Sequence, residues 1–239
     1  MSYEYSEDNL VEAAAQQVLE DLGWQVEYAW TKETFGNVEK HGRASLHRAS
    51  HTDLGREDKS EVVLKRYLLQ ALKKLNPNLP NAAYQHAIDQ ITQKAADKKL
   101  VQINKEKYTL LTKGVDVSFT NKKGELVKKK LKVFDFDNPT ENHFLAVRQL
   151  EVVGDLYNRR PDIVGFVNGI PLVFFELKAH HTDLRNAYTD NLTDYKDTIP
   201  HIFHSNAFII LSNGTDARVG TVTSSYKFFA EWKRIEEDE

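Results

Sequence analysis

Two carboxylates and a lysine stand at the ends of an otherwise apolar stretch, residues 160–179. Asp162 opens this stretch after a proline, and Glu176 and Lys178 close it with Leu177 between them. Two carboxylate oxygens and a backbone carbonyl, here that of Leu177, form a hard oxygen site suited to Mg²⁺, which keeps its other positions for water and phosphate. Such an ion polarises a phosphoryl oxygen, and Lys178 reaches the same water, where it can orient it or help its deprotonation. The chemistry that this set predicts is hydrolysis of a phosphodiester.

A β-hairpin is expected to bring these residues together. Two apolar runs, residues 163–167 and 170–175, flank Asn168 and Gly169, a dipeptide that favours a hairpin turn. Pro171 disfavours strand pairing right up to the turn, so we expect a loop of three residues beginning at Asn168.

That register places Asp162 directly opposite Glu176 on the neighbouring strand. Because side chains alternate across a strand, Glu176 and Lys178 share one face, and Asp162 joins them there. The alternative is a strand end that emerges into solvent, with Lys178 simply pairing with Glu176. The spacing of the three residues favours the metal site over this alternative.

The motif and the words around it resemble a known family. Pro161-Asp162 and Glu176-Leu177-Lys178 are similar to the two halves of the motif of the PD-(D/E)XK nuclease superfamily. Four short sequences around the motif resemble the N-terminal nuclease region of the restriction (motor) subunit of type I restriction-modification enzymes. They are residues 135–139, 142–144, 159–164 and 167–173. This resemblance covers nearly the whole chain. It implies an α/β fold with a restriction-endonuclease-like central mixed β-sheet, flanked by helices on both faces, in a single nuclease domain over residues 1–239.

The resemblance also implies roles for residues outside the hairpin. In that family an acidic residue of the first helix often joins the metal site, which points to Glu12; the alternative is a solvated helical glutamate. A Q-x-x-x-Y motif on the helix after the hairpin addresses DNA, and this chain has Asn191 and Tyr195 there, so the amide is one methylene shorter and its reach is in doubt. The alternative for Tyr195 is packing on the sheet. Arg159 and Arg160 could clamp a phosphate, contact a neighbouring domain, or pair with a local acid.

The function implied is Mg²⁺-dependent cleavage of duplex DNA as part of a larger ATP-dependent enzyme. In the resembled enzymes, methylation and specificity subunits recognise the DNA site, and two RecA-like motor domains follow the nuclease region. The chain contains no G-x-x-x-x-G-K-[ST] sequence, so we expect the ATP of the full-length subunit to bind elsewhere. We therefore expect a fragment of a longer subunit, with residues 235–239 as part of a linker. The alternatives are a stand-alone nuclease of DNA repair or junction resolution, and a non-catalytic docking domain, which the intact Asp, Glu and Lys set argues against.

Composition narrows the class of protein. With 41% hydrophobic and 28% charged residues, the 239-residue chain has the balance of an ordinary globular protein. The absence of cysteine excludes disulfides and thiolate metal sites and fits a cytoplasmic location. No apolar run approaches the roughly 18 residues of a membrane span, and the first residues are no signal peptide, so no membrane partner is expected. The net charge of −3 means that DNA contacts must come from local basic patches or from partners.

Hydrophobic periodicity predicts the order of the remaining elements. We expect a first helix with a wide apolar stripe, which Gly23 ends. The stripe contains Leu10, Ala14, Val18 and Leu22, with Val11, Ala15 and Leu19 beside them. Residues 31–59 lack a sustained period and predict a long loop. The other elements expected are strands at 24–30, 144–153, 207–211 and 217–222, helices at 60–75, 81–97 and 182–196, and extended segments at 108–119 and 126–136.

Three sets of polar or aromatic residues have a purely structural explanation as well as a functional one. The lysines at 128–130 and 132 predict a solvated edge strand in preference to a phosphate-facing patch. The histidines at 41, 47 and 51 lack zinc-like spacing and are expected on the surface. Phe228, Phe229 and Trp232 are expected either to close this domain or to form a seam with a following one.

Overall fold

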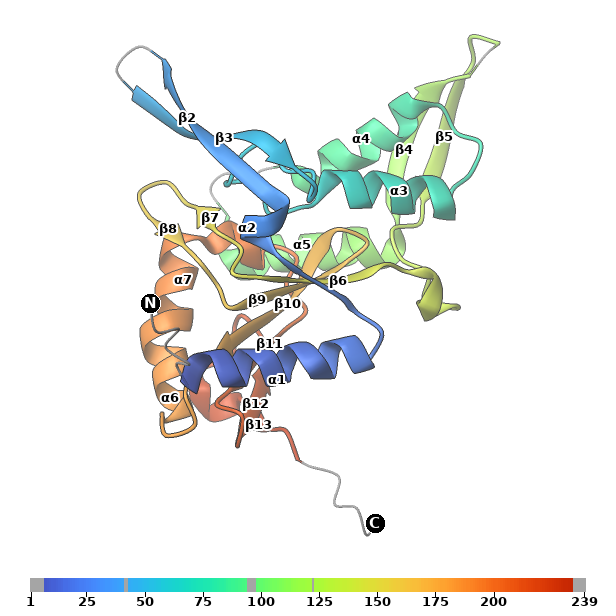
Figure 1. The fold of residues 1–239 in the computed structure, drawn as a ribbon. Helices are drawn as coiled ribbons and strands as arrows, with labels where there is room; N and C mark the ends of the chain where they lie inside the picture. The colour runs from blue at the N-terminus through green and yellow to red at the C-terminus, as the bar shows by residue number, and fades with distance from the viewer. Residues whose placement is uncertain (1–6, 41–42, 94–97, 122, 234–239) are drawn as a thin grey trace.

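The computed structural model describes residues 7–40, 43–93, 98–121 and 123–233 (Figure 1). Its centre is a mixed β-sheet, which contains seven strands in the described part of the chain. In spatial order these are β1 (Gln25–Tyr28), β6 (Phe144–Arg148), β9 (Ile163–Val167), β10 (Ile170–Leu177), β11 (Phe208–Ser212), β12 (Ala217–Gly220) and β13 (Ala230–Glu231). The pairs β1–β6 and β10–β11 are parallel and the others are antiparallel, so the expected mixed sheet is confirmed.

Helices cover both faces of this sheet, as expected. On one face Val173 and Phe175 of β10 pack in a cluster with Val11 of α1 (Glu7–Asp21). On the other face Phe174 packs against the rings of Tyr195 and Phe203. Alternation along β10 thus sends successive side chains to opposite layers, and Glu176 falls on the face that carries Phe174. Figure 1 shows α1 below the central strands and α3, α4 and α5 above them.

Only one side of the wide apolar stripe expected on α1 is buried, the side with Val11 and Leu19. Leu10, Val18 and Leu22 are 51%, 57% and 71% exposed. The buried residues are instead Val11, Glu12 and Leu19. The helix has two neighbouring apolar stripes, and hydrophobicity alone does not distinguish them. The stripe that contains Glu12 is the buried one because this glutamate pairs with Arg148, a buried arginine of the sheet. The ion pair turns the carboxylate of Glu12 toward the end of the sheet.

The hairpin turn is tighter than expected. Val167 pairs with Ile170, so that only Asn168 and Gly169 lie in the turn, with φ of 51° and 80°. These left-handed conformations are those of a two-residue turn, and the expectation of a three-residue loop is wrong. The register then shifts between Pro171 and Val173. After this shift the pairing is the expected one, with Phe175 opposite Ile163, because the irregularity adds the residue that the turn lacks.

The expected long loop at 31–59 is wrong over most of its length. After α2 (Ala29–Lys32), the strands β2 (Glu33–Lys40) and β3 (Arg43–Thr52) form an antiparallel ribbon that projects from the body in Figure 1. The ribbon pairs only with itself within the described residues, so its sequence shows no alternation of core and solvent positions. The three histidines at 41, 47 and 51 lie outside the residues whose side chains are described.

A buried ion pair fixes the base of this ribbon. Arg56 is 1% exposed, and its guanidinium bonds the carboxylate of Glu33 through Nε and Nη2. Its Nη1 also donates to the carbonyl oxygen of Glu151, at 3.0 Å. Arg56 therefore ties the first residue of β2 to the segment that follows β6.

A basic annex covers the tip of the hairpin. We define the annex as residues 65–131. It contains α3 (Lys65–Leu75), α4 (Asn81–Thr92), α5 (Leu100–Lys113), β4 (Val115–Thr120) and β5 (Leu126–Leu131). Its core continues onto Ile170 at the start of β10, and the Leu64 N–H donates to the carbonyl of Gly169 at 2.9 Å. Asn168 is buried there too, and its amide donates to the carbonyl of Val133 at 2.8 Å.

The prediction of an extended segment from residue 108 is wrong, because α5 continues to Lys113. The buried residues of α5 are Ile103, Lys107 and Leu111. Because the middle one is a lysine, the sequence lacks the continuous apolar stripe that predicts a helix. The ammonium of Lys107 donates to three carbonyls around the end of α4, those of Gln90, Ile91 and Gln93, at 2.6–3.2 Å. Burial lowers the pKa of Lys107, and these bonds satisfy its donors.

The helical segment after the hairpin lies close to the expected range. It consists of α6 (Leu184–Asn186), a π-helical stretch (Ala187–Leu192) and α7 (Thr193–Thr198), followed by a 3₁₀ turn (Pro200–Phe203). Short strands β7 (Val152–Val153) and β8 (Asn158–Arg159) pair with each other. Near the end of the described chain, Phe229 is buried in the core, whereas Phe228 and Trp232 are exposed. No helix among the described residues is both long and apolar enough to span a bilayer.

Candidate active site

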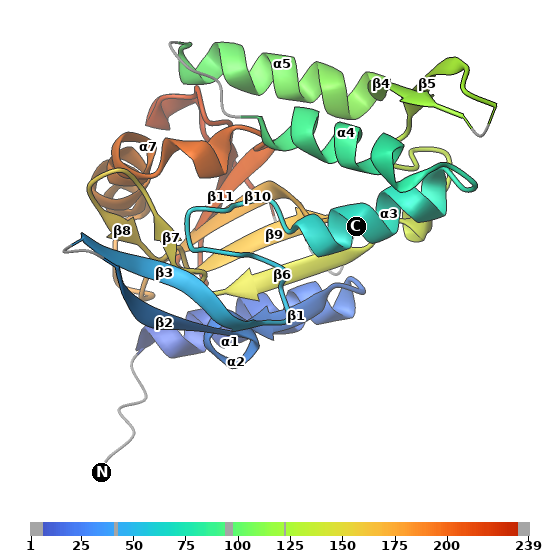
Figure 2. The ribbon, with the colours of Figure 1, turned by 90° about the horizontal axis from the view of Figure 1, so that it is seen from above.

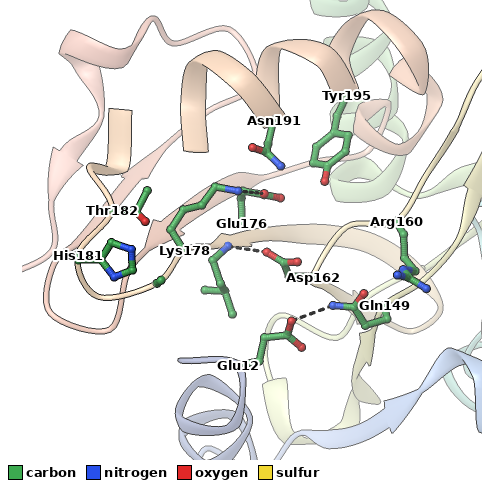
Figure 3. A pocket seen from close by; sticks show the side chains of 12 residues that line it. Glu12, Gln149, Arg160, Asp162, Glu176, Lys178, His181, Thr182, Asn191 and Tyr195 are labelled. Carbon is green, nitrogen blue, oxygen red and sulfur yellow. Dashed lines mark hydrogen bonds and ion pairs between the residues drawn. The ribbon is translucent and has the colours of Figure 1, made fainter. Parts of the chain in front are cut away.

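A cavity of about 680 Å³ lies at the end of the sheet where β10 finishes and β9 begins (Figure 3). Its walls come from α1, the end of β6, the β9–β10 hairpin and the helical segment that follows. The lining residues are Glu12, Gln149, Arg160, Asp162, Glu176, Leu177, Lys178, Ala179, His181, Thr182, Asn191 and Tyr195. The fold thus brings together all the predicted site residues except Arg159.

Glu176 is the most deeply buried acid of the cavity, with 1% of its surface exposed. One carboxylate oxygen, Oε1, lies 3.0 Å from the ammonium of Lys178. The other, Oε2, is buried and accepts no hydrogen bond of standard geometry from a described residue, although the phenol of Tyr195 also interacts with this carboxylate and acts to lower its pKa. Burial raises the pKa of Glu176 to about 8, and the negative charge of Asp162 adds to this rise, while Lys178 opposes it. A buried carboxylate oxygen without a well-placed donor is costly, so this site fits a bound cation.

Asp162 is held across the hairpin from Glu176. Its Oδ2 accepts a hydrogen bond from the backbone N–H of Leu177, at 2.7 Å. The carbonyl of Asp162 in turn accepts the N–H of Gln149, at 2.9 Å. Asp162 and Glu176 therefore face one cavity, beside the backbone of Leu177, and these residues fit the oxygen ligands that Mg²⁺ prefers.

Glu12 reaches the same cavity from α1, but its carboxylate is already bonded. Arg148 Nη2 lies 2.7 Å from Oε2, and Gln149 Nε2 donates to Oε1 at 2.9 Å. Glu12 is only 8% exposed, so the alternative of a solvated helical glutamate is wrong. Among the residues that the structure describes, no three acidic, histidine or cysteine side chains are grouped closely enough to hold one metal ion. The geometry accordingly does not make Glu12 a third direct ligand beside Asp162 and Glu176.

Asn191 and Tyr195 project into the cavity from successive turns of the helical segment (Figure 3). The ring of Tyr195 also packs edge-on against Phe174, with centroids 5.6 Å apart. Sheet packing and cavity lining, weighed as alternatives for this residue, are therefore both present. Burial raises the pKa of Tyr195, and the nearby charge of Glu176 raises it further, so the phenol stays protonated and can donate a hydrogen bond.

The two arginines before the hairpin have different surroundings. Arg159 does not line the cavity, because its guanidinium pairs with the carboxylate of Asp194, with Nη2 2.8 Å from Oδ1. It also lies over the ring of Tyr157, at 5.1 Å from the centroid. Arg160 is exposed and lines the cavity. A phosphate clamp beside the metal site can therefore be built on Arg160, whereas Arg159 has the ion pair with a local acid.

Four cavity residues were not predicted from the sequence, namely Gln149, Ala179, His181 and Thr182. Gln149 leaves β6 with a φ of +54°, and this left-handed backbone turns its side chain into the cavity. The available signal was a polar pair, Arg148 and Gln149, directly after the apolar run of β6. His181 and Thr182 follow Lys178 closely in the chain, and that proximity was their only signal.

Comparison with known proteins agrees with this geometry. The family model described as "Type I restriction enzyme R protein N terminus" matches residues 4–228. The chain belongs to this family.

Two curated relatives match it over almost its full length. It is 36% identical over 234 residues to the type I restriction enzyme HindI endonuclease subunit of Haemophilus influenzae, which covers 96% of this chain and 20% of that subunit. It is 30% identical over 239 residues to the putative type I restriction enzyme MjaIXP endonuclease subunit of Methanocaldococcus jannaschii, with 98% of this chain and 21% of the relative covered. The resemblance stated from the sequence is confirmed, and the chain spans about one fifth of the length of these relatives.

Proposed function

We propose that this chain is a Mg²⁺-dependent endonuclease domain, which hydrolyses phosphodiester bonds of duplex DNA as part of an ATP-dependent type I restriction enzyme. The single observation that carries the proposal is the buried Oε2 of Glu176. This oxygen lacks a hydrogen bond of standard geometry from any described residue, beside Lys178 and across the hairpin from Asp162. Membership of a family whose named relatives are endonuclease subunits supports the same reading.

Asp162, Glu176 and the carbonyl of Leu177 would hold the metal ion. When bound, Mg²⁺ would polarise the phosphoryl oxygen and favour departure of the alkoxide. Glu176 has to release its proton for this, because its pKa is raised to about 8 in the metal-free site. Lys178, fixed by Glu176, would orient the attacking water or help its deprotonation.

The other cavity residues would position the DNA. Arg160 would clamp a phosphate, and the phenol of Tyr195 and the amide of Asn191 would donate hydrogen bonds to it. Glu12 is bonded to Gln149 and would hold this amide in the cavity wall. We therefore assign Glu12 a supporting role in the site, separate from the ligands of the ion.

The remaining parts of the reaction would come from partners. Since the chain spans about one fifth of its relatives, we propose that motor domains elsewhere in the subunit bind ATP. Methylation and specificity subunits would select the DNA, in the cytoplasm. The stand-alone nuclease and the non-catalytic docking domain remain alternative functions. The intact Asp, Glu and Lys set in one cavity opposes the second of them.

The test is plasmid cleavage by the intact assembly with Mg²⁺ and ATP, using the variants Asp162→Ala, Glu176→Ala and Lys178→Ala. We expect each to lower the cleavage rate by at least about a hundredfold, as losses of catalytic groups commonly do. ATP hydrolysis should be unchanged, because the motor is separate. The matched control is Asp190→Ala, an exposed acid of the helical segment that does not line the cavity. Unchanged cleavage by all three site variants would remove the assignment.

A further inference from the structure

The charges of this chain are separated along its length. The annex holds fifteen Lys and Arg and five Asp and Glu, whereas the other residues hold seventeen and thirty. The overall charge of −3 therefore conceals an annex with a surplus of ten positive charges and a remainder that is strongly acidic. A basic region of this kind is the usual electrostatic footprint of nucleic-acid binding.

The annex also contains a second concave surface. A groove of about 670 Å³ runs between α5 and the start of the β4–β5 ribbon, and four of the side chains that line it are Lys98, Lys105, Lys113 and Lys130. Figure 2 shows α5 leading into this ribbon beside α4. Lysines that only protect a strand edge would lie on the strand. Three of these four belong to α5 or precede it, so edge protection does not explain them.

A glycine brings the two walls of the groove together. Gly114 ends α5 with a φ of +86°, and a Cβ at this position would lie 2.8 Å from the carbonyl oxygen of Leu131 and 3.0 Å from Cγ of Lys130. Any other residue would push α5 away from β5. The close approach therefore keeps Lys113, the last residue of α5, and Lys130 of β5 in the lining of one groove.

Two of the groove lysines lack a compensating acid. Lys98 pairs with Glu106 at 2.8 Å, and Lys130 pairs with Asp116 at 2.7 Å. Lys105 and Lys113 are exposed and form no ion pair with a described residue. Neighbouring ammonium groups repel one another, so this arrangement favours a polyanionic ligand.

The groove is rigidly connected to the face of the sheet that bears the cavity. The side-chain amide of Asn104 in α5 donates to the carbonyls of Phe203 and Asn206, at 3.2 and 2.8 Å. This segment follows the helix that carries Tyr195. From Ile170 at the annex to Glu176 at the cavity, β10 advances by about 20 Å, at about 3.3 Å per residue. One turn of duplex DNA rises by about 34 Å, which exceeds this length of the hairpin.

We propose that the groove between α5 and the β4–β5 ribbon binds the phosphate backbone of duplex DNA, outside the cleavage cavity. The inference rests on the proposed function, since it takes the substrate to be a duplex. The annex would then bind the DNA, and the residues at the end of the hairpin would cleave it. Such a contact is independent of base sequence, because phosphates carry no sequence information directly.

The experiment is fluorescence anisotropy of this chain with a labelled duplex of about 20 base pairs, long enough for both sites at about 3.4 Å per base pair. It is carried out in EDTA over a range of salt concentrations. The variant is Lys105→Gln with Lys113→Gln, and the control is Lys227→Gln with Lys233→Gln, which removes two exposed lysines outside the annex. We expect binding by the groove variant to be about tenfold weaker, and the slope of log K against log salt to shrink by about 2. The control should match the wild type, and thermal unfolding should show that both variants are folded.

Equal affinity and slope for all three proteins would overturn the proposal, as would a wild type that does not bind the duplex at all. The Asp162→Ala variant separates this outcome from failure of the proposed function. If the cavity assignment is right, Asp162→Ala loses cleavage in the intact assembly, whereas its DNA affinity in EDTA does not fall, because no cationic group has been removed. If Asp162→Ala cleaves normally while the groove variant binds weakly, only the cavity assignment fails.

Discussion

Burial keeps Glu176 largely protonated below about pH 8, so a cation that binds there has to compensate for the burial of its negative charge. Lys178 supplies part of this compensation, and Asp162, on the other strand, works against it. The pair of carboxylates is thus held in an arrangement that is unfavourable without a metal ion. The hydrogen bond from the Leu177 N–H maintains the arrangement by fixing Asp162 in place.

This arrangement predicts that metal affinity depends on pH. Because Glu176 has a pKa of about 8 in the folded, metal-free protein, binding of Mn²⁺ or Mg²⁺ below pH 8 has to displace a proton. We expect the affinity to rise about tenfold per pH unit from pH 6 toward pH 8, and to level off above it. Calorimetric titration with Mn²⁺ at several pH values measures this slope.

The control is His181→Gln, because His181 is an ionisable side chain that lines the same cavity. We expect this variant to keep the slope and Glu176→Gln to lose it. The same pKa shift has a consequence for stability. The folded state holds the proton more tightly than the unfolded chain, so the contribution of Glu176 is complete below its ordinary pKa and is lost as the pH rises through about 8. An affinity that is constant from pH 6 to 8 would contradict the assignment.

Sequence reasoning found the residues that carry local signals. Asp162, Glu176 and Lys178 lie at the ends of one hairpin, so their meeting follows from the period of a strand and the position of the turn. Gln149 joins them only because β6 lies next to β9 and ends in a left-handed residue. Neither of these facts is encoded in the residues near the motif, which explains why Gln149 was missed.

At the scale of elements, the ribbon β2–β3 depends on a single buried pair. Arg56 and Glu33 are almost fully buried, and Arg56 also bonds the backbone after β6. We expect Arg56→Met to destabilise the protein by about 3–5 kcal/mol, because it leaves the carboxylate of Glu33 buried without a positive charge to pair with. Chemical denaturation gives this value, and hydrogen exchange should show faster opening of β2 and β3.

An exposed arginine provides the comparison for this prediction. Arg66→Met should change the stability by no more than about 0.5 kcal/mol, as surface substitutions usually do. Replacing both partners, Arg56→Met with Glu33→Met, should restore part of the loss, since no charge is then left unpaired. If Arg56→Met is no more harmful than Arg66→Met, the pair does not anchor the ribbon.

Elements with a regular hydrophobic period could be predicted, whereas those without one were misread. The β9–β10 hairpin and the helical segment after it were expected in nearly their observed ranges. The sequence of the ribbon predicts a loop because neither of its strands joins the central sheet, so it shows no alternation of buried and exposed residues. In α5 the lysine at 107 interrupts the apolar stripe, and only the carbonyls at the end of α4 explain its burial.

At the scale of the molecule, the annex and the sheet meet at the hairpin turn. A Cβ on Gly169 would lie 2.5 Å from the carbonyl oxygen of Leu64 and 2.8 Å from the N–H nitrogen of Leu68. Gly124 has almost the same φ, +81° against +80°, but has no atom within 4 Å of such a Cβ. We expect Gly124→Ala to cost about 1 kcal/mol for the backbone conformation alone. We expect Gly169→Ala to cost about 1–3 kcal/mol more, because backbone atoms must move.

Thermal or denaturant unfolding of the two variants measures the difference. The pair shares one backbone conformation, so the excess isolates the packing of the annex on the turn. Equal destabilisation by both substitutions would mean that the annex is not seated on Gly169.

The uneven distribution of charge gives the molecule a large electric dipole moment, with its positive end at the annex. In the electric field of a polyanion, such a molecule rotates before contact, so that its positive end approaches the polyanion first. If the polyanion is the proposed duplex, its phosphates would otherwise repel the end that holds Asp162 and Glu176. On the proposed function, the separation of charge would therefore set an order of arrival, in which the lysines make the first contact and the carboxylates reach the phosphates afterwards.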